Sequence, residues 1–349
     1  MSTARDLACP NPKGNTVTAT APALSFDRNI PRDIVHRESI AEVFLTDAQP
    51  SGSGAVFAAQ LPRNHSYFSD HRGTATTYDP LLLIEVFRQV AIYYAHTFVG
   101  VERAQKFIFG AADFEIVDRE TFRIGSCPGH CTITAEVLEE KKRDEVVIGL
   151  TLEMTAYIEG QVAAREKMAF QWMPPEVWGR IRCRGRNSLG LPDAHEVPAA
   201  APVARMRPGA VGRHNPRNAI LANPTIDEGG AEISALTVID TNHPSLFDHA
   251  LDHVPGMLQF EAARQIAMAA ANASLGFDTN RMVMHRLEMK FEKFGEFEID
   301  TFARATVEAD PNEEGALVAT IRITQGEESI ASGRVYLQVM PVDIWTMVQ

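Results

Sequence analysis

The sequence predicts an α+β fold in which two similar domains each wrap an antiparallel sheet around one long central helix. Its 349 residues are too many for one average domain and enough for two hydrophobic cores, with 45% apolar and 22% charged residues. The pattern Glu-x-x-Arg-Gln occurs twice, 176 positions apart, each time within a strongly apolar segment. Alternating apolar and polar runs, which are typical of strands, stand before and after both segments.

The recurrence indicates a tandem duplication, so the chain should form a pseudo-dimer of its own halves. A glycine follows each apolar segment at the same spacing, Gly100 and Gly276. Two further pairs of segments agree, NHSYFSDH with NHPSLFDH and AFQWMP with YLQVMP. A repeat of this length implies two domains rather than a solenoid of short units.

The composition between the repeats places the domain boundaries. We expect a flexible tail at 1–30, a first domain at 31–175, a Pro/Arg-rich linker at 176–214 and a second domain at 215–349. The region from 176 to 217 holds eight arginines against three acidic residues. This local basic excess is either a solvated linker or a docking surface for an acidic partner or a phosphate.

Within each half the elements follow one order. Two short strands come first, IAEVFLTD and AVFAAQLP in the first half, joined by AQPSGSG. That joint is typical of a hairpin turn, because it lacks the glycine spacing of a phosphate-binding loop. The helix at 81–96 has no wide polar face, so we expect the sheet to enclose it. Longer strands follow, namely HCTITAEVLEE, EVVIGLTLEMTAYI and QVAAREKMAFQWM in the first half and DTFARATVEA, ALVATIRIT and SIASGRVYLQVM in the second.

Charge and composition exclude several classes of protein. The formal net charge of −12 argues against nucleic-acid binding, which needs a surplus of Lys and Arg. No apolar run approaches the about 18 residues of a membrane span, and no signal peptide opens the chain, so we expect a cytoplasmic protein without a membrane partner. The segment CPGHC fits a Pro-Gly turn better than a zinc site, which needs four ligands. We therefore predict no metal and no cofactor.

The candidate site residues occupy positions i, i+3 and i+4 of the two apolar segments and so share one helical stripe. They are Glu85, Arg88 and Gln89 in the first half and Glu261, Arg264 and Gln265 in the second. Charges inside a buried helix need partners, because their desolvation is costly. Each Glu either pairs with its own Arg and fixes the register of the two helices, or faces a ligand cleft.

The residues before the second helix favour acyl chemistry. In DHALDHVPGM, the side chains of His249, Asp252 and His253 lead to Gly256 and Met257, where exposed backbone N–H groups favour negative charge. A thioester carbonyl there would meet an oxyanion hole, with a carboxylate one turn away as a base. The first half has RGTATTYDPLLLIE instead, so we expect one productive site per chain.

Several motifs resemble known families. PGMLQFEAARQ resembles the helix entry of hotdog-fold acyl-carrier-protein dehydratases, although Phe247 stands where those enzymes carry their catalytic histidine. The whole chain, from 34 to 341, is more similar to the A-factor biosynthesis hotdog family of γ-butyrolactone signal synthases. The motifs that carry this similarity are IVHRESIAEVFLTD, NHSYFSDH, DPLLLIEVFRQV, VGRHNPRNAIL and FDHALDHVPGMLQFEAARQ. The resemblance implies a tandem, or double, hotdog fold.

The resemblance further implies an acyl transfer. A β-ketoacyl group moves from acyl carrier protein to the hydroxyl of dihydroxyacetone phosphate, and the ester then condenses to a butenolide phosphate. On this basis we expect Glu85 of the first half and Arg264 of the second to form a composite catalytic site. Glu261 and Arg88 are the alternative catalytic pair. A carboxylate would activate the hydroxyl, and a guanidinium would bind the phosphate or the developing oxyanion. The residues expected to contact the substrates are His249, Asp252, His253, Gly256, Met257, Gln89 and Gln265.

Other functions are compatible with the same residues. A thioesterase or a dehydratase-like enzyme would act on water or an enoyl group, a related synthase would feed the ester toward furan-type signals, and a sensor would only bind an acyl chain or lactone. The sequence does not decide whether two chains pair as a homodimer. His65 and His243, in the two Asn-His motifs, are expected to cap turns.

Overall fold

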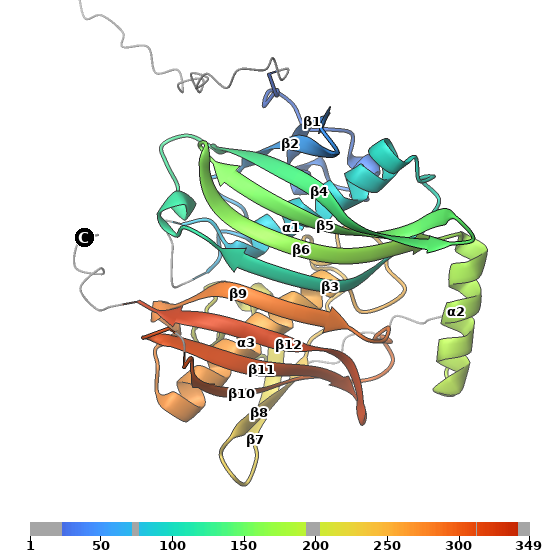
Figure 1. The fold of residues 1–349 in the computed structure, drawn as a ribbon. Coiled ribbons are helices and arrows are strands. Elements are labelled where there is room, and N and C mark those ends of the chain that lie inside the picture. Colours follow the sequence, from blue (N-terminus) through green and yellow to red (C-terminus); the bar gives the residue numbers. More distant parts are fainter. Residues whose placement is uncertain (1–22, 72–76, 193–202, 312, 341–349) are drawn as a thin grey trace, which may run out of the picture.

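The computed structural model describes residues 23–71, 77–192, 203–311 and 313–340. Its strands form one 12-stranded sheet in the order β1-β2-β4-β5-β6-β3-β9-β12-β11-β10-β8-β7. The second half repeats the first in mirrored order, so the two halves lie like the subunits of a dimer (Figure 1). The predicted tandem hotdog fold is confirmed, with one refinement: the two sheets are joined edge to edge through β3 and β9.

Both halves contain the same elements among the described residues. In the first half these are β1 (Leu45–Ser51), β2 (Gly54–Leu61), α1 (Pro80–Tyr94), β3 (Lys106–Ile116), β4 (Gly129–Arg143), β5 (Val146–Ile158) and β6 (Gln161–Met173). In the second half these are β7 (Leu221–Ile226), β8 (Glu232–Thr237), α3 (Gly256–Leu275), β9 (Met282–Phe291), β10 (Thr301–Ala309), β11 (Ala316–Gln325) and β12 (Glu328–Val339). Each long helix packs against the strands of its own half.

The ends of the two helices explain why glycine recurs at the same place in each half. Gly100 follows the single π-helical turn that extends α1, and Gly276 follows α3. Their φ angles are 83° and 73°, in the left-handed region that glycine adopts without a steric penalty. At the other end, Asp79 caps α1 by accepting a hydrogen bond from the N–H of Leu81, and Pro80 occupies the first helical position.

The first contact between the halves is the pairing of β3 with β9. The pairing is antiparallel and runs from Ala111 opposite Lys290 to Glu115 opposite Arg286. Neither strand was identified from the sequence. Each forms the last strand of its own half, so its second neighbour comes from the other half of the chain.

The second contact is an exchange of aspartates between the halves. Asp248 accepts hydrogen bonds from the backbone N–H groups of Glu38 and Ser39, at 2.7 and 2.9 Å. In the same way, Asp70 accepts those of residues 214 and 215, at 3.1 and 3.0 Å. Both aspartates come from the repeated motifs NHSYFSDH and NHPSLFDH, so each copy of the motif orders the start of the opposite half.

The segment predicted to be a linker begins with a helix, α2 (Pro175–Ser188), which runs beside the second half (Figure 1). Arg182 and Arg186 are buried and bind the carboxylate of Glu296 at 2.5 and 2.7 Å. Arg213, from the other end of that segment, is also fully buried. The expectation of a solvated basic linker is therefore wrong for these three arginines, because acidic groups elsewhere in the fold neutralise them.

Parts of the predicted organisation lie outside the described residues. These are residues 1–22 of the expected tail and residues 193–202 of the expected linker. Within the described ranges, no helix combines the length and the apolar character that crossing a membrane requires.

Candidate active site

Glu85 is the centre of a buried ion-pair cluster in the first half. It has no exposed surface, and it accepts hydrogen bonds from Nε of Arg37 at 3.0 Å and from Nε and Nη2 of Arg88 at 2.8 and 2.9 Å. Burial alone would raise the pKa of Glu85, but the charges of Arg37 and Arg88 outweigh it and hold the pKa at about 2. Glu85 is therefore a permanent carboxylate and a poor general base near neutral pH.

Glu261 is the centre of the corresponding cluster in the second half. It accepts hydrogen bonds from Nε of Arg213 at 2.8 Å and from Nη2 of Arg264 at 2.5 Å. A second carboxylate, that of Asp79, binds Nη1 of Arg264 with both oxygens, at 2.9 and 3.0 Å. Arg213 lies 176 positions after Arg37, so the buried arginine is part of the same duplication as the helices.

The two glutamines of the repeated pattern bind the backbone just before the first strand of their own halves. The side chain of Gln89 accepts a hydrogen bond from the N–H of Phe44 and donates one to the carbonyl of Glu42, at 3.0 and 2.8 Å. Gln265 does the same with Ile220 and the carbonyl at position 218, at 2.9 and 2.7 Å. Both side chains are fully buried, which gives them a structural role in place of the expected contact with substrate.

The two turn histidines behave as expected. Nδ1 of His65 accepts hydrogen bonds from the backbone N–H groups of Tyr67 and Phe68, both at 3.2 Å. Nδ1 of His243 accepts those of residues 245 and 246 in the same way. Both rings therefore order the turns from which the exchanged aspartates project.

The structure does not bring Glu85 and Arg264 together. Each side chain takes part in the cluster of its own helix, and no hydrogen bond or ion pair joins the two among the described residues. A first-half residue that does bind Arg264 is Asp79, whose carboxylate precedes α1 and reaches across to α3. The expected composite pair is therefore not a geometric unit.

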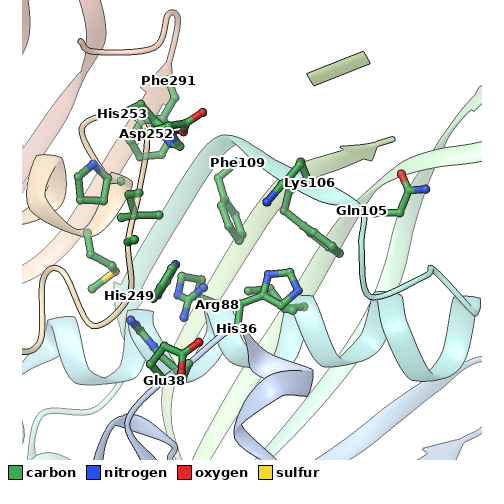
Figure 2. Close-up of a pocket in the computed structure, with 18 of the residues that line it drawn as sticks. His36, Glu38, Arg88, Gln105, Lys106, Phe109, His249, Asp252, His253 and Phe291 are labelled. Atoms are coloured by element: carbon green, nitrogen blue, oxygen red, sulfur yellow. Dashed lines mark hydrogen bonds and ion pairs between the residues drawn. The ribbon is translucent and has the colours of Figure 1, made fainter. Parts of the chain in front are cut away.

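A cavity of about 1040 Å³ lies between the two halves (Figure 2). Its lining residues include six that the sequence predicted, namely Arg88, His249, Asp252, His253, Gly256 and Met257. The other predicted residues are not part of its lining, namely Glu85, Glu261, Arg264, Gln89 and Gln265. Apolar side chains form much of the remaining wall, among them Ile92, Phe107, Phe109, Met168, Phe260 and Phe291.

One side of the cavity is basic. His36, Arg88 and His249 lie close together there, beside the start of the first half (Figure 2). Burial, followed by the neighbouring His96 and Arg88, lowers the pKa of His36 to about 3. The pKa of His249 is lowered by burial and by Arg88 as well. Both histidines are therefore neutral at pH 7, and Arg88 supplies the charge.

The opposite side carries an Asp-His dyad (Figure 2). Nδ1 of His253 lies 2.6 Å from Oδ1 of Asp252, and Nε1 of Trp178 donates to Oδ2 of the same carboxylate at 2.9 Å. Nη2 of Arg182 donates to the backbone carbonyl of Asp252 at 2.7 Å. Burial would raise the pKa of Asp252, but its hydrogen bond with His253 lowers it, followed by that with Trp178. Helix α2 therefore positions the dyad.

The sequence did not predict five residues that belong to the cavity or to the two clusters, namely Arg37, Arg213, Asp79, His36 and Trp178. A signal existed for the two arginines, since they share the spacing of 176 that marks the helices. The contribution of Trp178 had no such signal, because it depends on how α2 packs against the second half.

The fold and the cavity define a tandem hotdog protein whose site is formed by both halves. The family model described as the A-factor biosynthesis hotdog domain matches residues 18–174 and 195–341. The chain therefore belongs to this family.

The chain is similar to two curated relatives that share the name 2-oxo-3-(phosphooxy)propyl 3-oxoalkanoate synthase. The relative from Streptomyces virginiae is 33% identical over 241 residues, which cover 69% of this chain and 76% of the relative. The relative from Streptomyces coelicolor is 26% identical over 296 residues, which cover 84% and 86%. A solved 12:0-ACP thioesterase from Umbellularia californica aligns with a TM-score of 0.47 and 8% identity, covering 83% of this chain and 99% of that one. A likeness this distant carries no argument about activity.

Proposed function

We propose that this chain transfers a 3-oxoacyl group from the thioester of an acyl carrier protein to the primary hydroxyl of dihydroxyacetone phosphate. The product is then the 2-oxo-3-(phosphooxy)propyl 3-oxoalkanoate that the name of the Streptomyces relatives describes. Membership of the family supports the class of reaction. The observation that carries the proposal is the cavity. It has basic residues at one end, an Asp-His dyad at the other, and apolar walls between them.

The apolar walls suit the acyl chain of the donor. Phe107, Phe109 and Met168 come from the central strands of the first half, and Phe260 and Phe291 come from the second half. Binding sites for small molecules are commonly apolar, with a few polar groups that orient the ligand. The acyl chain therefore lies between the two halves, and the polar ends of both substrates meet Arg88 and the dyad.

His253 provides the base that a primary hydroxyl requires. Its Nδ1–H donates to Asp252, so Nε2 carries the lone pair and accepts the hydroxyl proton as the acceptor oxygen attacks the thioester carbon. A C–O bond forms, the C–S bond breaks, and His253 returns the proton to the leaving thiolate. Glu85 acts here as a positioning residue that holds Arg37 and Arg88 in place.

The exposed side of α2 is the docking surface for the carrier protein in this proposal. Arg180 and Arg184 are exposed on α2, while Trp178 of the same helix lines the cavity. The whole chain has a net charge of −12, so an acidic carrier protein needs a local basic surface in order to approach. A carrier bound at α2 delivers its thioester beside the dyad.

Thiol release from a 3-oxoacyl thioester of N-acetylcysteamine tests the proposed reaction. We expect release to depend on dihydroxyacetone phosphate and to fall about 10²- to 10⁴-fold in His253→Gln, the range for a lost general base. His214→Gln is the matched control, because this histidine is exposed and outside the cavity. Release that proceeds equally without dihydroxyacetone phosphate would indicate a thioesterase. Absence of release from folded protein would indicate a binding protein.

A further inference from the structure

The carboxylate of Asp79 occupies a defined anion position in the second cluster. It is fully buried, and four residues interact with it. These are Nη1 of Arg264 at 2.9 and 3.0 Å, the N–H of Leu81 at 2.9 Å, Nη1 of Arg213 at 3.7 Å and Nδ1 of His71 at 3.9 Å. Asp79 thereby balances the charge of the arginine pair and caps the N-terminus of α1.

All four partners of Asp79 have counterparts in the first cluster and the cavity. The duplication pairs Arg264 with Arg88, Leu81 with Met257, Arg213 with Arg37 and His71 with His249. Asp79 itself is paired with Pro255, which brings neither a charge nor a side-chain cap to α3. The first half of the molecule therefore keeps counterparts of all four partners but has no carboxylate at the position of Asp79. Another buried carboxylate, that of Asp248, lies 4.0 Å from Nη1 of Arg37 and 3.6 Å from Nδ1 of His249.

The unfilled position faces the cavity. Arg88, His249, Pro255 and Met257 all line it. The hydrogen bonds of Arg88 to Glu85 use Nε and Nη2, and no described residue accepts a hydrogen bond from Nη1. That atom is the counterpart of the one with which Arg264 binds Asp79.

We infer that the phosphate of the acceptor substrate takes the place that Asp79 fills in the second cluster, bound by Arg88, the N-terminus of α3 and His249. This inference rests on the proposed function for the identity of the acceptor. What the first cluster lacks, relative to the second, is a permanent negative charge at this position, beside Nη1 of Arg88. A phosphate supplies it in the ground state, whereas a thioester oxygen is charged only as the reaction proceeds.

The electrostatics of the first cluster are compatible with a bound anion. Burial and the neighbouring charge of Arg37 lower the pKa of Arg88, although Glu85 and Asp248 act to raise it. An anion beside Nη1 of Arg88 would give this guanidinium a further close counter-charge.

Pro255→Asp tests the inference, because it installs the carboxylate of the second cluster in the first. Pro255→Asn is the matched control, since it also caps α3 but adds no negative charge beside Arg88. We expect calorimetric titration with inorganic phosphate to show binding weakened at least about tenfold in Pro255→Asp and less than about threefold in Pro255→Asn. Equal weakening in both variants, or no weakening in either, would overturn the inference.

A second variant covers the case in which Pro255→Asp does not fold. Arg88→Gln removes the charged donor instead of occupying the site, and it should also weaken phosphate binding at least about tenfold. Unchanged phosphate binding in folded Arg88→Gln would again contradict the assignment.

The choice of acceptor separates phosphate from acyl oxygen. The value of kcat/KM would be measured with dihydroxyacetone phosphate and with dihydroxyacetone. We expect the ratio of the first value to the second to fall toward one in Pro255→Asp. An equal loss with both acceptors would assign the position to the thioester oxygen and overturn the inference. If phosphate binding responds to Pro255→Asp but the wild-type protein transfers no acyl group, the proposed function fails and the anion site stands.

Discussion

Replacing Glu85 by Gln removes the carboxylate that binds both Arg37 and Arg88, with almost no change of shape. The pKa of Glu85 is about 2 in the folded protein, against an ordinary value of 4.5. That difference corresponds to about 3 kcal/mol of stability at neutral pH. Breaking a buried ion pair costs about the same, 3 to 5 kcal/mol. We therefore expect Glu85→Gln to lower the free energy of unfolding by about 3 kcal/mol at pH 7.

The stability difference between wild type and Glu85→Gln should depend on pH in a defined direction. Because the folded pKa is depressed, the contribution is complete above the unfolded pKa of about 4.5 and is lost as the pH falls toward 2. The difference between wild type and Glu85→Gln should thus shrink to about 1 kcal/mol near pH 3.

Urea denaturation at several pH values measures this difference. Glu120→Gln is the control, because Glu120 and Arg123 form an ion pair of the same i, i+3 spacing in which both side chains are exposed. That variant should leave the unfolding midpoint unchanged within error. A Glu85→Gln protein as stable as wild type at pH 7, or a deficit that does not change with pH, would refute the reasoning.

Three further predictions concern the dyad, the docking surface and the fold. Asp252→Asn should lower kcat at least about tenfold with a smaller effect on KM, because His253 loses the group that orients it; equal thiol-release kinetics to wild type would exclude the dyad. Arg180→Glu with Arg184→Glu should lower the ratio of kcat/KM for carrier-bound substrate to that for the small thioester at least about fivefold, and an unchanged ratio would place the carrier elsewhere. Gly212→Ala should lower the melting temperature more than Gly190→Ala does. Both glycines have φ of 71°, but only at Gly212 would an added Cβ meet a neighbouring atom, Sδ of Met268 at 2.5 Å. Equal losses would mean that backbone strain alone sets the cost.

The duplication made most of the fold predictable. The spacing of 176 located both central helices and the left-handed glycines that end them. It could not locate β3 and β9, because each pairs with a strand of the opposite half and no local pattern records that partner.

For helix α2, amino-acid composition led to the wrong prediction of a solvated linker. Its Pro, Gly and Arg content is typical of a linker, yet Arg182 and Arg186 are one turn apart and face Glu296, which lies more than a hundred positions further along the chain. Charge counted in a local window therefore overstated the exposed basic surface. Of the four arginines of α2, two are exposed as the sequence suggested, namely Arg180 and Arg184.

The site was predictable in part for a physical reason. The cost of burying charge indicated that Glu85 and Glu261 must have partners, but it did not indicate which. The departure of the first half from the Pro-Gly helix entry pointed to a single productive site. Asp79, which replaces Pro255 at that departure, is the group that fills the second cluster.

The mass of the product tests the central claim most directly. The purified protein would be incubated with a 3-oxoacyl carrier protein and dihydroxyacetone phosphate, and the small-molecule fraction analysed by mass spectrometry. We predict the ester of the two substrates, or the butenolide phosphate formed by its condensation. Free 3-oxo acid in place of either product would contradict acyl transfer to the triose.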